Sequence, residues 1–232
     1  MAAVNRRTVW VTACALAIVA GVLAAWNWRR IGGTAVINGP IIFLSIDTLR
    51  ADRLPAYGST RTRTPNIDRL VADGVLFETA YAHSPQTLPS HTSILSGELP
   101  FEHGVRDNIG FTVKAGQRFV QHALREQGYA TGAFVSSYVL RHQTGINQGF
   151  DVYDDYLPAA SAATPLGQVQ RPGEQTLAAA MRWLDAQPAA RFFLFAHLYE
   201  PHTPHAAPAR FTGVDRYDAE VAYSDEIGRA HV

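Results

Sequence analysis

The stretch PIIFLSID, residues 40–47, decides the fold class of this chain. It is almost continuously apolar up to its aspartate, which is the pattern of a strand covered on both faces, as in a parallel sheet. Helical and strand patterns alternate downstream of it. We therefore expect an α/β fold with a mostly parallel sheet flanked by helices.

The clearest helix after this strand covers residues 64–74. It has an N-cap threonine, a proline at the first helical position and a closing glycine. The other predicted elements are strands at 75–80, 130–135 and 191–197, helices at 89–95, 117–127 and 174–186, and an exposed loop at 157–173.

The N-terminus predicts a membrane-directed segment. No charge interrupts the eighteen residues of Val9–Trp26, which as a helix would span about 27 Å. We expect residues 1–30 to be a signal anchor, with 31–39 as a linker and the rest anchored outside the cytoplasm at an inner membrane. A cleaved signal peptide, giving a secreted or periplasmic protein, and a core helix are the alternatives.

The charge balance and the cysteine count exclude several function classes. Residues 1–30 contain four of the 20 basic residues and none of the 20 acidic ones, so the remainder carries 16 basic and 20 acidic residues. That balance shows no nucleic-acid footprint, and we expect no nucleic-acid partner. The only cysteine, Cys14, lies in the apolar run, so neither a disulfide nor a cysteine nucleophile is expected.

Three polar residues follow apolar runs and could share one crevice. Asp47, Thr87 and His202 each come just after such a run, and ligands of open α/β sheets bind beyond the carboxyl ends of the strands. Asp47 is a candidate metal ligand. Its alternative roles are a helix cap or a salt bridge to Arg50 or Arg53.

Thr87 lies in PQTLPSHTSILSG, residues 85–97, at the start of a predicted helix. A threonine hydroxyl needs an adjacent base or a cation to act as a nucleophile. A helix start also offers backbone N–H groups and a positive dipole end to an anion. The site would suit phosphate or sulfate esters, but this stretch alone favours the alternative that Thr87 and Ser90 are ordinary N-cap residues.

Three histidines follow the apolar run FFLFA, at positions 197, 202 and 205. Prolines at 201 and 204 should hold the turn open, which would leave at least one imidazole accessible for proton transfer near neutral pH. Surface histidines without function are the alternative, and this spacing does not define a zinc site.

Six motifs are ordered along the chain: SIDTLRADRLPAYG (45–58), TPNIDRLVADGVLFETAYA (64–82), TLPSHTSILSG (87–97), HGVRDN (103–108), GFDVYDD (149–155) and FFLFAHLYEPHTP (192–204). Together they resemble the N-terminal part of the sulfatase family, within the alkaline-phosphatase-like superfamily. The resemblance covers nearly everything from Pro40 to Gly228 and implies metal-dependent hydrolysis of sulfate esters.

The resemblance also implies roles for single residues. Asp47 would bind one divalent cation, Ca²⁺ first and otherwise Mg²⁺, Mn²⁺ or Zn²⁺. Thr87 would occupy the nucleophile position and share the cation, and His202 would protonate the leaving group. His91, at the end of the nucleophile motif, joins the catalytic set. The substrate would be an anionic ester, either a sulfated or phosphorylated glycan, a lipid or a small molecule, and the N-terminal helix would meet the membrane.

The chain departs from the family pattern at several positions. Thr87 replaces the Cys or Ser that becomes formylglycine, so we expect no formylglycine, and His91 replaces an Arg. Thr48 stands where a second metal-binding Asp is usual, and the only lysine, Lys114, lies outside the sulfate-contacting pattern. A threonine nucleophile is instead similar to that of extracytoplasmic phosphotransferases of the superfamily. A phosphotransferase or phosphoesterase, and an inactive binding module or gene fragment, are therefore the alternatives.

The C-terminal part of the sulfatase pattern is not found. The second pair of metal ligands does not occur, so we expect residues 40–229 to be the N-terminal portion of a catalytic domain with little activity by itself. The last residues, EIGRAHV, can be encoded by a widely used sequencing adapter. We expect 230–232 to be such an artefact; the alternative is a natural sequence to Arg229 followed by a stop.

Overall fold

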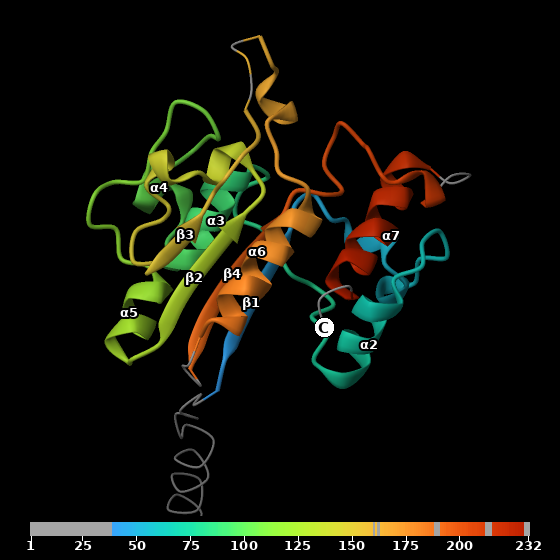
Figure 1. Ribbon diagram of the computed structural model, residues 1–232, viewed down its shortest axis with the longest axis horizontal. Coiled ribbons are helices and arrows are strands. Elements are labelled where there is room, and N and C mark those ends of the chain that lie inside the picture. The colour runs from blue at the N-terminus through green and yellow to red at the C-terminus, as the bar shows by residue number, and fades with distance from the viewer. Residues whose placement is uncertain (1–38, 160, 162, 188–190, 212–214, 230–232) are drawn as a thin grey trace, which may run out of the picture. The chain divides into compact units, whose positions relative to one another are not determined.

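A four-stranded parallel sheet lies at the centre of the protein. The computed structural model describes residues 39–159, 161, 163–187, 191–211 and 215–229, which belong to one unit beginning at Gly39. The sheet has the order β1-β4-β2-β3, and every neighbouring pair is parallel (Figure 1). Its strands are β1 (Ile41–Ile46), β2 (Ala130–Val135), β3 (Val152–Asp154) and β4 (Phe192–Leu198). The expected α/β fold with a parallel sheet is confirmed.

Helices pack on both faces of the sheet, because alternate strand residues point to opposite sides. On one face, Phe134 and Leu194 form a core with α6 (Gly173–Asp185). Gly132 lies under the Trp183 ring, where a Cβ would come within 2.9 Å of the indole. On the other face Ala133, Val135, Phe193 and Phe195 form a larger core with residues of α3 (Thr87–Ser96) and Phe119, which precedes α5 (Val120–Glu126).

The remaining helices extend from this centre. They are α2 (Pro65–Asp73), α4 (Pro100–His103) and α7 (Arg216–Arg229), with short 3-10 turns at Ala51–Arg53, Pro55–Tyr57, Tyr138–Leu140, His142–Thr144, Leu166–Gln168 and Ala209–Phe211. α2 packs on α7 (Figure 1). Buried Asp225 of α7 accepts bonds from the backbone N–H groups of Asn66 and Ile67, so a carboxylate of one helix caps the N-terminus of the other.

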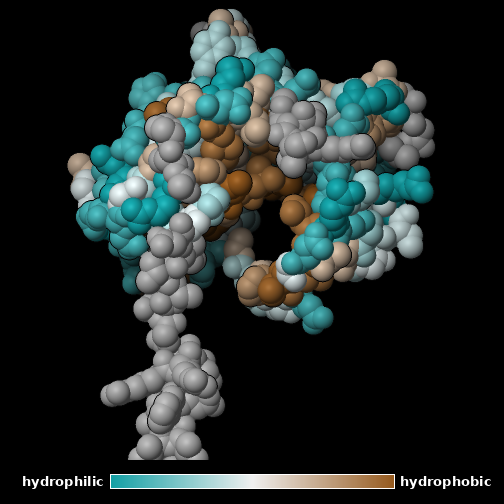
Figure 2. Space-filling view, turned by 60° about the horizontal axis from the view of Figure 1, so that its bottom comes forward, coloured by the Kyte–Doolittle hydropathy of each residue, from teal (hydrophilic) through white to brown (hydrophobic). Residues whose placement is uncertain are grey.

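Two sequence predictions are wrong in this structure. Residues 75–80 pair with no strand of the described chain; Val75 is 81% exposed and Phe77 71% exposed. β1 lies at the edge of the sheet with Ile42 and Leu44 exposed, so in the described residues it is covered on one face only. Figure 2 shows apolar atoms gathered in a hollowed part of the surface. The apolar sequence of β1 predicts burial on both faces, but no described residues cover the face that carries Ile42 and Leu44.

The predicted signal or anchor segment at 1–30, residues 31–38 of the linker, and the adapter-like residues 230–232 all lie outside the described residues. Within the described part of the chain, no helix combines the length and apolarity needed to cross a bilayer.

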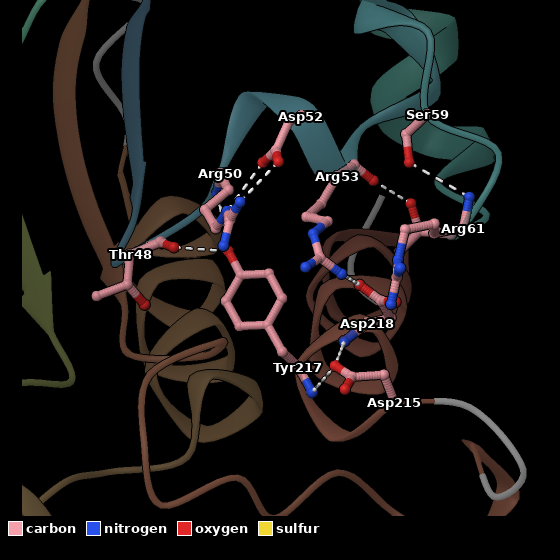
Figure 3. Close-up of polar contacts among 10 residues, drawn as sticks. Thr48, Arg50, Asp52, Arg53, Ser59, Arg61, Asp215, Tyr217 and Asp218 are labelled. Atoms are coloured by element: carbon pink, nitrogen blue, oxygen red, sulfur yellow. Dashed lines mark hydrogen bonds and ion pairs between the residues drawn. The ribbon is translucent and has the colours of Figure 1, made fainter.

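The backbone directly after β1 is fixed by contacts with α7 (Figure 3). Thr48 has a φ of 54°, a left-handed conformation that is uncommon outside glycine. The Tyr217 hydroxyl donates to the Thr48 carbonyl at 2.6 Å and accepts from the Arg50 N–H at 2.8 Å. Asp218, which is 4% exposed, pairs with Arg53 at 2.6 Å and Arg61 at 3.0 Å. These contacts hold the turn that leads away from Asp47.

We expect Asp218→Asn to lower the free energy of unfolding by about 3 kcal/mol, because it leaves the largely buried Arg53 guanidinium without its carboxylate. Asp52→Asn, which breaks an ion pair between exposed side chains, should cost less than about 1 kcal/mol. Urea denaturation of both variants measures the difference. Equal losses would show that the Asp218 pairs contribute no more than a surface contact.

Candidate active site

The carboxyl end of β1 and the start of α3 bring the first two predicted site residues together. Asp47 follows β1, and its N–H bonds to the Leu198 carbonyl at 3.0 Å. Thr87 is the first residue of α3, and its hydroxyl donates to Asp47 Oδ2 at 3.1 Å. Asp47 is only 8% exposed. The predicted carboxylate and hydroxyl are therefore in direct contact, although 40 residues separate them.

The Thr87 hydroxyl does not cap the helix that it begins. The N-cap of α3 is Gln86, with no side-chain capping bond, and the Ser90 N–H bonds to the Gln86 carbonyl. The Leu88 N–H is taken by Asn108 Oδ1 at 2.8 Å. The N-cap alternative therefore does not describe this hydroxyl. The positive end of the helix dipole remains near it, but the N–H groups of Leu88 and Ser90 are already bonded and are not open to an anion.

His91 is bonded to the backbone of Thr87 and helps to fix its position. Its ring is 5% exposed, Nδ1 donates to the Thr87 carbonyl at 2.7 Å, and Nε2 accepts from Ser45 Oγ at 2.8 Å. Burial, with help from the charge of His197, lowers the pKa of His91 to about 4. The imidazole is therefore neutral near pH 7, and both of its nitrogens are occupied. This geometry suits a residue that positions Thr87 more than one that touches the ester.

His197, the last but one residue of β4, is a member of the site that the sequence analysis did not single out. It is fully buried, Nε2 lies 3.4 Å from Asp47 Oδ2, and neither ring nitrogen has a hydrogen-bond partner in the described chain. Its ring meets His91 edge-on at 5.1 Å. Burial acts to raise the pKa of Asp47, but interactions with His197, His202 and His91 outweigh it, and the pKa lies below its ordinary value. Asp47 is therefore an anion at neutral pH.

His202 stands in the turn after β4. Its ring stacks on Tyr199 with centroids 4.3 Å apart, and Nδ1 donates to the Thr203 carbonyl at 2.6 Å. That bond leaves Nε2 to exchange a proton. The half-buried ring and its favourable electrostatic effect on Asp47 place His202 at the same end of the sheet.

These residues fit part of a divalent-cation site. The Asp47 and Thr87 oxygens lie 3.1 Å apart, and adjacent oxygen ligands of an octahedral ion at about 2.1 Å would be about 3 Å apart. His197 Nε2 lies 3.4 Å from Asp47 Oδ2 without a hydrogen bond in the described residues, so it is a further nitrogen beside these oxygens. Within the described residues, no group of three or more His, Cys, Asp or Glu side chains forms a site that could hold a metal.

Comparison with known proteins identifies relatives that are similar to this chain in sequence. The chain is 36% identical over 99 residues to N-acetylgalactosamine-6-O-sulfatase of Bacteroides thetaiotaomicron, a match that covers 40% of the chain and 19% of that protein. It is 32% identical over 96 residues to human N-acetylgalactosamine-6-sulfatase, covering 37% of the chain and 18% of that protein. The matches thus span about a fifth of the length of these relatives.

Solved structures share the fold at lower identity. A protein in complex with its substrate D-glucosamine-2-N,6-O-disulfate has a TM-score of 0.63 and 22% identity, covering 75% of this chain and 37% of the other. Phosphonate monoester hydrolase of Agrobacterium radiobacter has a TM-score of 0.58 and 22% identity, covering 75% and 43%. The model of the family described as Sulfatase matches residues 40–227. This match covers most of the chain and includes Asp47, Thr87 and His202. The chain therefore belongs to the sulfatase family of hydrolases.

Proposed function

We propose that the protein hydrolyses sulfate esters with Thr87 as its nucleophile and a divalent cation as its cofactor. The observation that carries this proposal is the 3.1 Å bond between the Thr87 hydroxyl and the anionic Asp47 carboxylate, at the strand ends where α/β enzymes bind ligands. Family membership supports the ester chemistry. Threonine at the nucleophile position makes formylglycine unnecessary.

Thr87, Asp47 and His202 can carry each proton transfer of the proposed reaction. Thr87 Oγ1 gives up its proton along its bond to Asp47 Oδ2 and attacks the ester sulfur. The bond from sulfur to the ester oxygen breaks, and His202 Nε2 gives that oxygen a proton. Water then attacks the sulfur of the sulfated Thr87 and gives a proton to His202 Nε2. The bond from sulfur to Thr87 Oγ1 breaks, Asp47 returns its proton to Oγ1, and sulfate is released with the hydroxyl restored. His91 holds the Thr87 turn throughout.

A divalent cation would be held by Asp47 and Thr87. When bound, it supplies the positive charge that makes a hydroxyl acidic near neutral pH. A carboxylate and a hydroxyl are hard oxygen donors, which suit Ca²⁺, Mg²⁺ and Mn²⁺; Zn²⁺ would suit the site if an imidazole joined these donors.

Phosphate esters are the second candidate substrates. The phosphonate monoester hydrolase shares the fold, and a threonine hydroxyl can attack phosphorus as readily in principle as sulfur. The names of the curated relatives favour a sulfated amino-sugar glycan over a phosphate ester. A binding module without turnover would show neither reaction.

Parallel assays test this order of preference. We expect the protein expressed from its complete reading frame to hydrolyse 4-nitrophenyl sulfate with a kcat/KM at least about tenfold above those for 4-nitrophenyl phosphate and bis(4-nitrophenyl) phosphate, a margin of about 1.4 kcal/mol in transition-state binding. A reversed order would assign the site to phosphoryl chemistry. Cation binding without turnover of any ester would favour the binding module.

A further inference from the structure

The His202 ring is held by its own segment of chain, residues 199–206. Its hydrogen bond and its ring stacking are to Thr203 and Tyr199, which belong to the same segment. Near the start of the segment, Glu200 accepts the Gly173 N–H at the first position of α6, at 3.0 Å. The place of the imidazole in the site therefore depends on what anchors this segment as a whole.

Glu220 of α7 anchors the far end of the segment. It is 2% exposed, and both of its carboxylate oxygens are used. Oε2 accepts the His205 Nδ1–H at 2.7 Å, and Oε1 accepts the Ala206 N–H at 2.6 Å. A buried carboxylate is costly unless it is hydrogen-bonded. Glu220 therefore favours the one arrangement in which the segment supplies both donors.

The same face of α7 also contacts the turn that follows Asp47 (Figure 3). Tyr217 and Glu220 are three residues apart, so they are neighbours on one side of the helix. The Tyr217 hydroxyl donates to the Thr48 carbonyl at 2.6 Å, and its ring meets the His205 ring edge-on, with centroids 5.8 Å apart. One helix face thus joins the turn after the candidate metal ligand to the segment of the candidate proton donor.

We propose that Glu220 is a positioning residue of the reaction. It holds segment 199–206 on α7 so that His202 Nε2 reaches the leaving oxygen of an ester bound at Asp47 and Thr87, and it does not touch the ester itself. This role rests on the proposed function, because it needs His202 as the proton donor. A general acid must lie within hydrogen-bond reach of the oxygen that it protonates, and a displacement of about 1 Å can cost about a hundredfold in rate.

Phenyl sulfate and 4-nitrophenyl sulfate test this role, because their leaving oxygens differ in their need for a proton. 4-Nitrophenol is the stronger acid, so its anion leaves with less help. For the protein from the complete reading frame, we expect Glu220→Gln to lower kcat about tenfold for phenyl sulfate and less than about threefold for 4-nitrophenyl sulfate. Glu226→Gln, at an exposed position of the same helix, should change neither. Equal losses with both substrates would overturn the positioning role.

Two further variants show whether Glu220 acts through the segment and its imidazole. His205→Asn removes the same bond from the more exposed side of the pair and should reproduce the difference between the substrates, even if Glu220→Gln failed to fold. In a His202→Ala background, Glu220→Gln should lower phenyl sulfate turnover less than about twofold further, because both changes remove one proton transfer. Independent losses that multiply would contradict the role.

Hydrogen exchange separates the anchor from the reaction. We expect Glu220→Gln to speed exchange of the backbone amides of segment 199–206 about tenfold, while the amides of β4 stay unchanged. That result in a protein that turns over no ester would support the anchor and contradict the proposed function. Unchanged exchange in the segment would overturn the anchor whatever the turnover.

Discussion

Replacing Thr87 by alanine is expected to lower kcat for ester hydrolysis at least about a thousandfold, because the substitution removes the hydroxyl that attacks sulfur in the proposed mechanism. The loss should appear in kcat more than in KM, since the hydroxyl acts on the transition state. Steady-state kinetics with 4-nitrophenyl sulfate on the protein from the complete reading frame measures it.

Thr87→Ser is the matched control for this prediction. Serine retains the hydroxyl that bonds to Asp47 Oδ2 and should keep turnover within about a factor of ten to a hundred of the natural enzyme. Because Thr87 does not cap α3, neither variant should lose much stability in urea denaturation. A Thr87→Ala protein that turns over substrate normally would remove the hydroxyl from the mechanism.

The contact between Asp47 and Thr87 was predictable because it follows from topology. A residue that ends an apolar parallel strand and a residue that begins the next buried helix both lie at the carboxyl edge of the sheet. The hydroxyl of Thr87 points to Asp47 instead of its own helix N-terminus, which local capping preferences alone do not indicate. The tertiary contact with Asp47 overrides the local capping preference of this threonine.

The place of His197 was harder to predict, although a signal was present. Strand alternation puts Phe193, Phe195 and His197 on one face, the face that forms the core with α3. The predicted strand at 191–197 already includes His197, but His197 is also the first of three closely spaced histidines, and that grouping points to the following turn. In the structure the strand continues to Leu198, and His197 Nε2 lies 3.4 Å from Asp47 Oδ2.

The errors at 75–80 and at β1 have a common cause. An apolar segment is expected to be buried, and β-propensity is largely a preference for a packed, pleated surface. Val75, Phe77, Ile42 and Leu44 are all exposed in the described residues. Their side chains specify burial, but the sequence pattern does not say which surface supplies it.

Asp47→Asn is expected to weaken binding of Ca²⁺ or Mn²⁺ at least about a hundredfold. Changes to residues that only support a ligand cost about 10- to 100-fold in metal affinity, and loss of an anionic ligand should cost more. The pKa of Asp47 lies below its ordinary value, so the natural side chain brings a full negative charge near pH 7 that the amide lacks. Titration calorimetry with each metal alone measures the change without relying on turnover.

Asp52→Asn provides the matched control, because Asp52 carries the same charge five residues later but pairs with Arg50 at the surface. Its metal affinity should equal that of the natural protein. Thr87→Ala should retain most of the affinity, because the carboxylate contributes the charge and the hydroxyl a neutral oxygen. If Asp47→Asn bound the cation as tightly as Asp52→Asn, the carboxylate would not be a ligand. The low pKa of Asp47 would then reflect only its electrostatic interactions with His197, His202 and His91.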